Sequence, residues 1–333
     1  MTTIIHIGSS KAMSTSIQSY FQNLGDDFFY FGMNFDIQKF KVKGVGSYYL
    51  DEDCRQLTKV LVNLDRFKGL DPQLKKNIQK KVKLANDQNK IFFYSCELFC
   101  ESSSLYLMME ILKEIFNDFK ILYITRNQYD ILKSVYCYEG HKFSYWTGKQ
   151  KYKFIPFSTF FETALHTHKT RGGHKSNYWV HDCIRIYNFH KITEILSKFL
   201  SKEDLLIFPF EEIQKKGDLN LITKFIAEKV NKKIPSQILS NNKSLYHVNV
   251  SNRKGAFYKT YAILSALNID PKKLNSKVKK FFNYKKLFKN SEDFKIDDKY
   301  FYEIKNLYLE DNLKLIEKFD FIKEHKSKYL FEK

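Results

Sequence analysis

The sequence has no apolar segment long enough to cross a membrane, no Cys-x-x-Cys pair, no internal repeat and no low-complexity linker. Its first apolar stretch, residues 4–7, is too short for a secretion signal and runs directly into Gly8. These absences exclude a membrane-spanning protein and a repeat architecture. We therefore expect a cytoplasmic protein with no membrane insertion.

Cysteine is scarce, and its spacing fits neither a disulfide framework nor a common metal site. The chain has an odd number of cysteines, and no second pair could join Cys96 and Cys100 to complete four zinc ligands. We expect reduced thiols with a structural role and no bound metal. The five residues are Cys54, Cys96, Cys100, Cys137 and Cys183.

Large apolar side chains and positive charge are abundant. Hydrophobic residues make up 43% of the 333 residues, with 31 Phe and 22 Tyr, which is enough for a substantial core. The formal net charge is +19. A polyanionic partner would explain this charge, but so would a need to keep a Phe-rich protein soluble, and composition alone leaves both explanations open.

Short apolar runs alternate with segments of helical periodicity over the first two thirds of the chain. Runs of β-branched and aromatic residues predict buried strands at 4–7, 90–94, 120–125 and 204–208, with a shorter strand at 28–31. The alternation predicts an α/β domain with a central parallel sheet flanked by helices. The expected helices cover 14–24, 55–67, 72–84, 104–116, 127–138, 157–165, 178–200 and 295–325.

The segment after the first strand has the composition of an anion site. A helix begins near Ser14, and its first backbone N–H groups have no partner within the helix. Lys11 adds a full charge, and Thr15 and Ser16 add hydroxyl donors. The alternative is an ordinary turn in which Ser14 only caps the helix.

Two common phosphate-binding loops do not fit this segment. The nucleoside triphosphatase loop G-x-x-x-x-G-K-[ST] places a hydroxyl after the lysine, whereas Lys11 lies three positions after Gly8 and is followed by Ala12. A kinase would also need an acidic residue at a later strand end, where Arg126 stands. The dinucleotide fingerprint fails because Gly8 has no glycine partner nearby.

Residues 7–18 instead resemble the 5′-phosphosulfate loop of the sulfotransferases that use 3′-phosphoadenosine 5′-phosphosulfate (PAPS), approximately I-G-x-P-K-x-G-T-T-S-L-Q. Ser10 replaces the usual proline and Met13 the usual glycine. The matching residues are Ile7, Gly8, Lys11, Thr15, Ser16 and Gln18. The resemblance implies that Gly8, Ser9, Ser10, Lys11, Ala12, Met13, Ser14, Thr15 and Ser16 bind the donor.

Two further motifs of the same family follow in the expected order. The third predicted strand ends in Arg126-Asn127-Gln128, which is similar to the family's R-N-P, and Ser134 lies eight positions after the arginine. In the family these two side chains hold the donor's 3′-phosphate. The segment Arg253-Lys254-Gly255 looks like the loop that wraps the same phosphate, although a basic turn without this role has the same composition.

The resemblance implies in-line transfer of a sulfuryl group from PAPS to a hydroxyl or amine, leaving 3′-phosphoadenosine 5′-phosphate (PAP), without a metal. Lys11 would stabilise the charge that develops on the 5′-phosphate. Glu97, after the second predicted strand, is the expected general base, and His141 is the alternative.

The expected fold is that of the sulfotransferases, which is similar to the P-loop nucleoside triphosphatases. One α/β domain would cover residues 1–270, with 140–177 as an insertion over the acceptor that includes a flexible basic segment at 166–175. A Lys-rich helical extension, 271–333, would pack on the same domain.

Aromatic and cationic residues between 136 and 181, including Trp146 and Trp179, favour an acidic or neutral glycan as acceptor, and core packing would explain the aromatic residues equally well. We expect no nucleic-acid partner, and the sequence does not indicate an oligomeric state. The competing hypotheses are a P-loop kinase and a non-catalytic basic protein that binds glycan or nucleic acid. The last of these predicts steep loss of binding with salt and no need for Glu97.

Overall fold

The computed structural model describes residues 2–8, 12, 14–35, 47–49, 51–64, 69–96, 99–102, 104–139, 156–170, 183–231 and 296–332. The chain divides into two compact units. The first contains Met1–Arg126, Asn188–Asn249 and Asp311–Lys333, and the second contains Asn127–Tyr187 and Val250–Glu310. The predicted domain boundary at residue 270 lies outside the described residues and stays a prediction.

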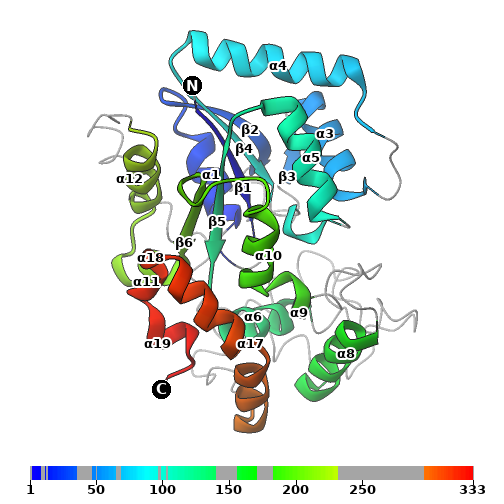
Figure 1. The fold of residues 1–333 in the computed structure, drawn as a ribbon, viewed down its shortest axis with the longest axis vertical. Helices are drawn as coiled ribbons and strands as arrows, with labels where there is room; N and C mark the ends of the chain where they lie inside the picture. The colour runs from blue at the N-terminus through cyan, green and yellow to red at the C-terminus, as the bar shows by residue number, and fades with distance from the viewer. Residues whose placement is uncertain are drawn as a thin grey trace, which may run out of the picture. The chain divides into compact units, whose positions relative to one another are not determined.

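A six-stranded sheet forms the centre of the first unit, in the order β3-β2-β4-β1-β5-β6 (Figure 1). Five strands are parallel, and β3 pairs antiparallel with β2 at one edge. This arrangement confirms the predicted α/β fold. The strands are β1 (Thr3–Ile7), β2 (Phe28–Phe35), β3 (Ser47–Tyr49), β4 (Ile91–Cys96), β5 (Lys120–Thr125) and β6 (Leu205–Pro209).

Strands β1, β4 and β6 are buried along their whole length, and β5 is buried except at Lys120, as expected for a parallel sheet that is covered on both faces. Their largely apolar runs made them predictable from the sequence, and the four predicted strands at 4–7, 90–94, 120–125 and 204–208 are confirmed. The strand predicted at 28–31 continues to Phe35 and pairs with β3, which the sequence analysis did not predict.

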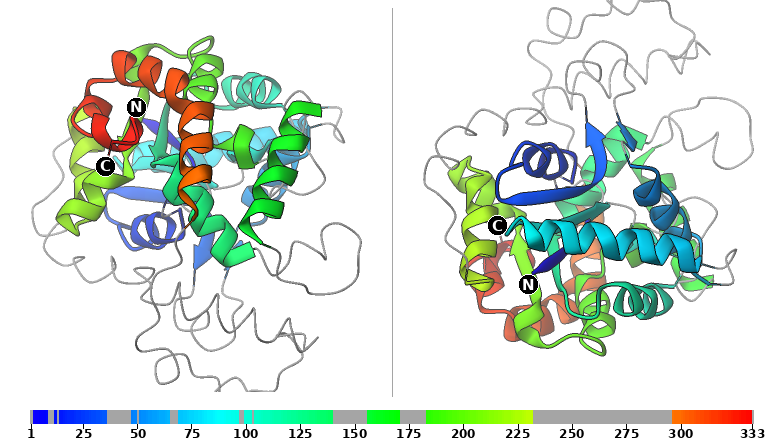
Figure 2. Two further views of the ribbon diagram at one scale, coloured as in Figure 1. Left: turned by 90° about the horizontal axis from the view of Figure 1, so that it is seen from below. Right: turned by 90° about the horizontal axis from the view of Figure 1, so that it is seen from above.

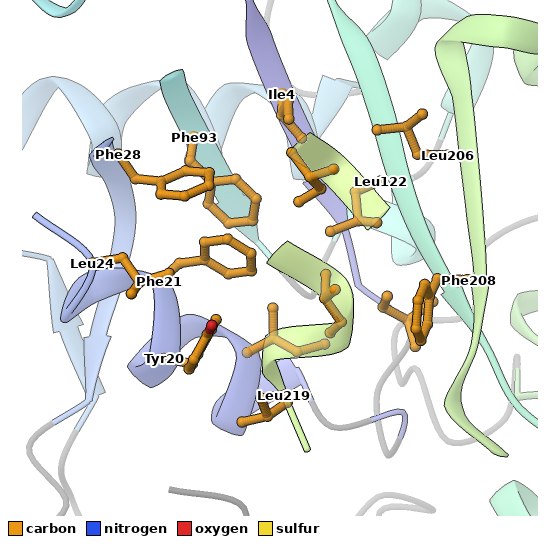
Figure 3. Packing of buried hydrophobic residues seen from close by; sticks show 14 of the residues in the cluster. Ile4, Tyr20, Phe21, Leu24, Phe28, Phe93, Leu122, Leu206, Phe208 and Leu219 are labelled. Carbon is orange, nitrogen blue, oxygen red and sulfur yellow. The ribbon is translucent and has the colours of Figure 1, made fainter. Parts of the chain in front are cut away.

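Helices α1 (Ser14–Gln22) and α12 (Asn220–Lys229) cover one face of the sheet. The Phe21 ring stacks on Phe93 of β4 with ring centroids 4.0 Å apart (Figure 3). The Tyr20 hydroxyl donates to Asn220 Oδ1 at 2.7 Å and lies 2.8 Å from Thr223 Oγ1. Apolar packing and this buried polar link together hold α1 against the sheet and against α12.

The other face is covered by α3 (Glu52–Val62), α4 (Pro72–Asp87), α5 (Leu105–Phe116) and α10 (Phe189–Leu196), as the views in Figure 2 show. Phe116 packs on Phe92 of β4, and Phe189 packs on Tyr123 of β5. Each of these helices begins with a side chain that caps a free N–H group. The caps are Asp51, Asp71, Ser104 and Asn188.

Short elements complete the first unit, and one of them, α18 (Asp320–Lys323), packs its Phe321 ring against Phe208 of β6 and Phe225 of α12. Gly217 ends α11 in the left-handed conformation (φ +66°), which suits a residue without Cβ, and its N–H donates to Ile213 O at 2.7 Å. These elements are η2 (Phe99–Glu101), η4 (Lys202–Asp204), α11 (Phe210–Lys216), α18 (Asp320–Lys323) and α19 (Lys326–Tyr329).

The second unit contains α6 (Gln128–Glu139), α8 (Phe157–Thr170), α9 (Cys183–Ile186) and the first part of α17 (Asp298–Lys318). Aromatic side chains form its core. Tyr136 of α6 packs edge-on against Phe157 of α8, and Tyr300 of α17 packs against both Phe157 and Phe161.

Four helix predictions differ from the structure. The helix expected over 55–67 begins earlier, at Glu52, and ends at Val62, with Asn63 as its C-cap. The helix expected over 178–200 is interrupted, because α9 ends at Ile186 and Asn188 caps a new helix by accepting from Lys191 N. The helix expected over 295–325 ends at Lys318 and is followed by α18 and α19. Finally, α8 extends through residues 166–170, which were expected to belong to a flexible segment.

Candidate functional site

The candidate site lies at the carboxyl ends of β1 and β5, which are neighbours in the sheet. The chain leaves β1 toward β2 on one side and leaves β5 toward β6 on the other. Such a topological switch point opens a crevice at the carboxyl edge of an open α/β sheet, and ligands bind there. The predicted donor loop follows β1, and Arg126 follows β5, so the topology brings both motifs to one edge.

Two contacts fix the start of the loop to the neighbouring strand β4. The Gly8 N–H donates to the carbonyl of Cys96 at 3.3 Å. His6 Nδ1 lies 2.8 Å from Ser95 Oγ, and both residues are fully buried. Burial lowers the pKa of His6 from 6.5 to about 3, so this histidine is neutral and adds no charge to the site.

The first turn of α1 contains three hydroxyl side chains, and their predicted role in binding the donor stays a prediction. Ser14 and Ser16 are buried, and Thr15 is half-buried. Ser16 Oγ and the side-chain amide of Gln18 have no hydrogen-bond partner among the described residues, although both side chains are almost completely buried. Buried polar atoms without partners are unfavourable. A polar ligand or ordered water at the helix N-terminus would satisfy them.

Arg126 follows the last residue of β5 and is only 9% exposed. Its guanidinium carbon lies 4.5 Å from the centre of the Phe210 ring, at the start of α11. The ring stabilises the cation, and stacking uses the face of the guanidinium while its N–H donors lie in the plane. The strand register accounts for this contact, because Thr125 pairs with Pro209, one residue earlier on each strand.

Three residues at this edge were not singled out by the sequence analysis. They are His6, Phe210 and Tyr329, whose hydroxyl lies 2.7 Å from Oγ1 of Thr125, the last residue of β5. Phe210 follows a strand end, which is a usable signal for a residue near the site. His6 and Tyr329 carry no local signal, because their contacts come from strand pairing and from a distant segment.

Several predicted site residues lie outside the described residues, and their roles stay predictions. Glu97 directly follows Cys96, the last residue of β4. Ser134 is half-buried on α6 in the second unit, so its predicted pairing with Arg126 also stays a prediction. The others outside the described part are Ser9, Ser10, Lys11, Met13, His141, Arg253, Lys254 and Gly255.

The described residues contain neither a candidate metal site nor a helix that could span a membrane. No group of three or more His, Cys, Asp or Glu side chains that could hold a metal occurs among them. The side chains of Cys54, Cys96, Cys100 and Cys183 are buried. No helix in this part of the chain has the length and apolar character needed to cross a bilayer.

No protein-family model matches the chain, and no curated protein matches its sequence. Solved structures do resemble it. A sulfotransferase from Alicyclobacillus acidocaldarius is 12% identical, with a TM-score of 0.44, and the match covers 81% of this chain and 96% of that one.

Two sulfotransferase domains each match 85% of this chain, with TM-scores of 0.37. One belongs to the curacin biosynthetic pathway (11% identity, 96% of that chain), and the other belongs to the olefin synthase of Synechococcus PCC 7002 (8% identity, 94% of that chain).

Proposed function

We propose that this protein is a sulfotransferase that transfers a sulfuryl group from PAPS to a hydroxyl or amine of an acceptor. The observation that carries the proposal is the placement of two sequence motifs. The loop of residues 8–16 and Arg126 follow adjacent parallel strands at the topological switch point.

The residues present fit a bisphosphorylated donor. The N-terminus of α1 offers backbone N–H groups and buried hydroxyls, and Ser16 Oγ and the Gln18 amide lack partners among the described residues. Lys11 would neutralise the charge that develops on the 5′-phosphate. Arg126 would bind the 3′-phosphate through its planar donors. The chemistry therefore requires fixed cations and backbone donors and does not require a metal.

The donor supplies an activated sulfuryl group when it is bound. The acceptor oxygen or nitrogen forms a bond to sulfur while the bond from sulfur to the 5′-phosphate oxygen breaks, and PAP leaves with that electron pair. Glu97 would accept the proton that the acceptor loses, and His141 is the alternative base. For the acceptor we propose a glycan, because aromatic and cationic residues are frequent between residues 136 and 181.

The test is calorimetric titration of the purified chain with PAP at moderate salt, next to ATP with Mg²⁺. We expect micromolar binding of PAP and no magnesium-dependent binding of ATP. Magnesium-dependent ATP binding would instead support a kinase. Binding of any polyanion with a steep salt dependence, and no preference for PAP, would support a non-catalytic basic protein.

The acceptor is tested separately by incubating the protein with PAPS and a panel of glycans, lipids and small phenols. Mass spectrometry of the products should show the mass of one added sulfuryl group on a glycan. Sulfation of a phenol or lipid alone would contradict the glycan assignment and leave the donor assignment intact.

A further inference from the structure

The last helical segment of the chain reaches the carboxyl ends of β5 and β6 within the first unit. Tyr329 of α19 is fully buried. Its hydroxyl lies 2.7 Å from Thr125 Oγ1, at the end of β5, and donates to Glu211 Oε2 at 3.1 Å, at the start of α11. One side chain therefore joins the end of β5, directly before Arg126, to the start of α11, directly after Phe210.

The direction of these hydrogen bonds follows from the number of protons. A tyrosine hydroxyl has one proton, and that proton is directed at Glu211. Thr125 must then donate its own proton to the Tyr329 oxygen. Burial, followed by the charge of Glu211, holds the pKa of Tyr329 well above its usual value, so the hydroxyl stays protonated at physiological pH.

The two partners of Tyr329 are the sequence neighbours of the stacked cation and ring. Thr125 immediately precedes Arg126, and Glu211 immediately follows Phe210, whose ring lies 4.5 Å from the guanidinium carbon. The hydroxyl thus connects the backbone positions on either side of the stacked pair. A change in this link would alter the spacing of Arg126 and Phe210 and the direction of the guanidinium donors.

Other contacts hold Tyr329 in place independently of its hydroxyl. The buried Asn312 donates from Nδ2 to the carbonyl of Tyr329 at 2.8 Å. His325 Nε2 lies 3.0 Å from Glu212 Oε2, and Lys216 also pairs with Glu212. Removal of the hydroxyl alone should therefore leave α19 docked, which makes Tyr329→Phe an informative change.

We propose that Tyr329 is a positioning residue that aligns Arg126 for the donor's 3′-phosphate, an inference that rests on the proposed function. Through this residue the C-terminal segment would complete the anion site. Tyr329 acts through Thr125 and Glu211 and does not itself contact the donor.

The first experiment compares the binding of PAP and of adenosine 5′-phosphate, which lacks the 3′-phosphate, to the wild type and to Tyr329→Phe. We expect PAP to bind about tenfold more weakly and adenosine 5′-phosphate to change less than about twofold. The matched control is Tyr94→Phe, because Tyr94 is also buried and its hydroxyl lies 2.9 Å from Thr58 Oγ1, away from β5 and β6. It should leave both affinities unchanged. An equal loss for both nucleotides would show a general structural effect and overturn the proposal.

The second experiment does not depend on the donor. Phenylglyoxal modifies arginine side chains, and peptide mass spectrometry can follow the modification of Arg126. Tyr329→Phe should raise the rate of phenylglyoxal modification at Arg126 several-fold over that of the wild type, and Tyr94→Phe should not. An unchanged rate would overturn the proposal. If the wild type binds no PAP but the rate at Arg126 rises, the proposed function fails while the positioning of Arg126 by Tyr329 stands.

Discussion

His6 Nδ1 lies 2.8 Å from Ser95 Oγ, and the two residues pair across β1 and β4 on the same face of the sheet. The donor loop begins two residues after His6, and the candidate base Glu97 comes two residues after Ser95. This single buried contact therefore joins the two strand ends that precede the proposed donor loop and the proposed base. Because burial keeps His6 neutral in the fold, while the unfolded chain protonates it below pH 6.5, the stability of the fold should depend on pH.

The first prediction is a loss of stability in acid that depends on His6. The pKa of His6 is about 3 in the fold and 6.5 when unfolded, so the unfolded chain binds more protons between these values. The resulting stabilisation is complete above pH 6.5 and is lost as pH falls below it. Chemical denaturation between pH 7 and 4 measures the unfolding free energy. As pH falls, this free energy should decrease more steeply for the wild type than for His6→Gln, by up to about 1.4 kcal/mol per pH unit.

The His6→Gln variant cannot titrate at this position, and carboxylate titrations elsewhere are common to both proteins. The difference between the two slopes therefore isolates His6. Identical slopes would mean that the folded protein takes up a proton at His6.

The second prediction concerns Lys11. Lys11→Ala should reduce sulfuryl transfer by about a hundredfold or more, because the charge that develops on the 5′-phosphate loses its cation. Thermal unfolding should change little. The control is Lys76→Ala on the exposed surface of α4, which removes the same charge from the protein. Near-normal turnover of Lys11→Ala would refute the 5′-phosphate assignment.

The third prediction concerns the 3′-phosphate. Arg126→Ala should weaken PAP by roughly thirtyfold or more, and Ser134→Ala should weaken it by about tenfold. Adenosine 5′-phosphosulfate, which lacks the 3′-phosphate, should be affected far less by either change. Arg126→Lys keeps the charge but not the planar donors, so its affinity for PAP should lie between those of the wild type and Arg126→Ala. Equal losses for both nucleotides would mean that these side chains bind another group.

The fourth prediction assigns the general base. Glu97→Gln should leave the affinity for PAP within a few-fold and lower the rate by roughly a hundredfold to ten-thousandfold. The wild-type rate should rise with pH through one acidic ionisation, and this dependence should disappear in the variant. His141→Ala is the comparison. If the large, pH-dependent loss of rate occurs in His141→Ala and not in Glu97→Gln, the general base is His141 and not Glu97.

The sheet could be predicted because its information is local. Residues 4–7 are apolar except for His6, and residues 121–124 are all apolar, which is the pattern of a short strand buried on both faces. The break before α10 was less visible, since Asn188 ends one helical pattern and caps the next within a sequence that keeps its apolar spacing.

The contacts that hold Arg126 in place could not be predicted from the sequence. Arg126 was identifiable from its position at a strand end, but the contact that holds it depends on Tyr329, 204 residues after Thr125. No spacing rule relates two residues so far apart. The contact between Arg126 and Phe210 could have been predicted from the sequence. Each residue directly follows a strand, and strands that follow one another along the chain are usually neighbours in the sheet, as β5 and β6 are.

The assembly of the first unit from three separated chain segments has a consequence for biosynthesis. At about 5–20 residues per second, a ribosome needs about 10 to 40 seconds to proceed from Thr125 to Tyr329. At the start of that interval the nascent chain contains five of the six strands, and the sixth is added during it. Tyr329, the hydrogen-bond partner of Thr125 and Glu211, has not yet been made. The carboxyl ends of β5 and β6 therefore lack this hydrogen-bond partner until residue 329 has been made, and chaperones have this interval in which to bind the incomplete sheet.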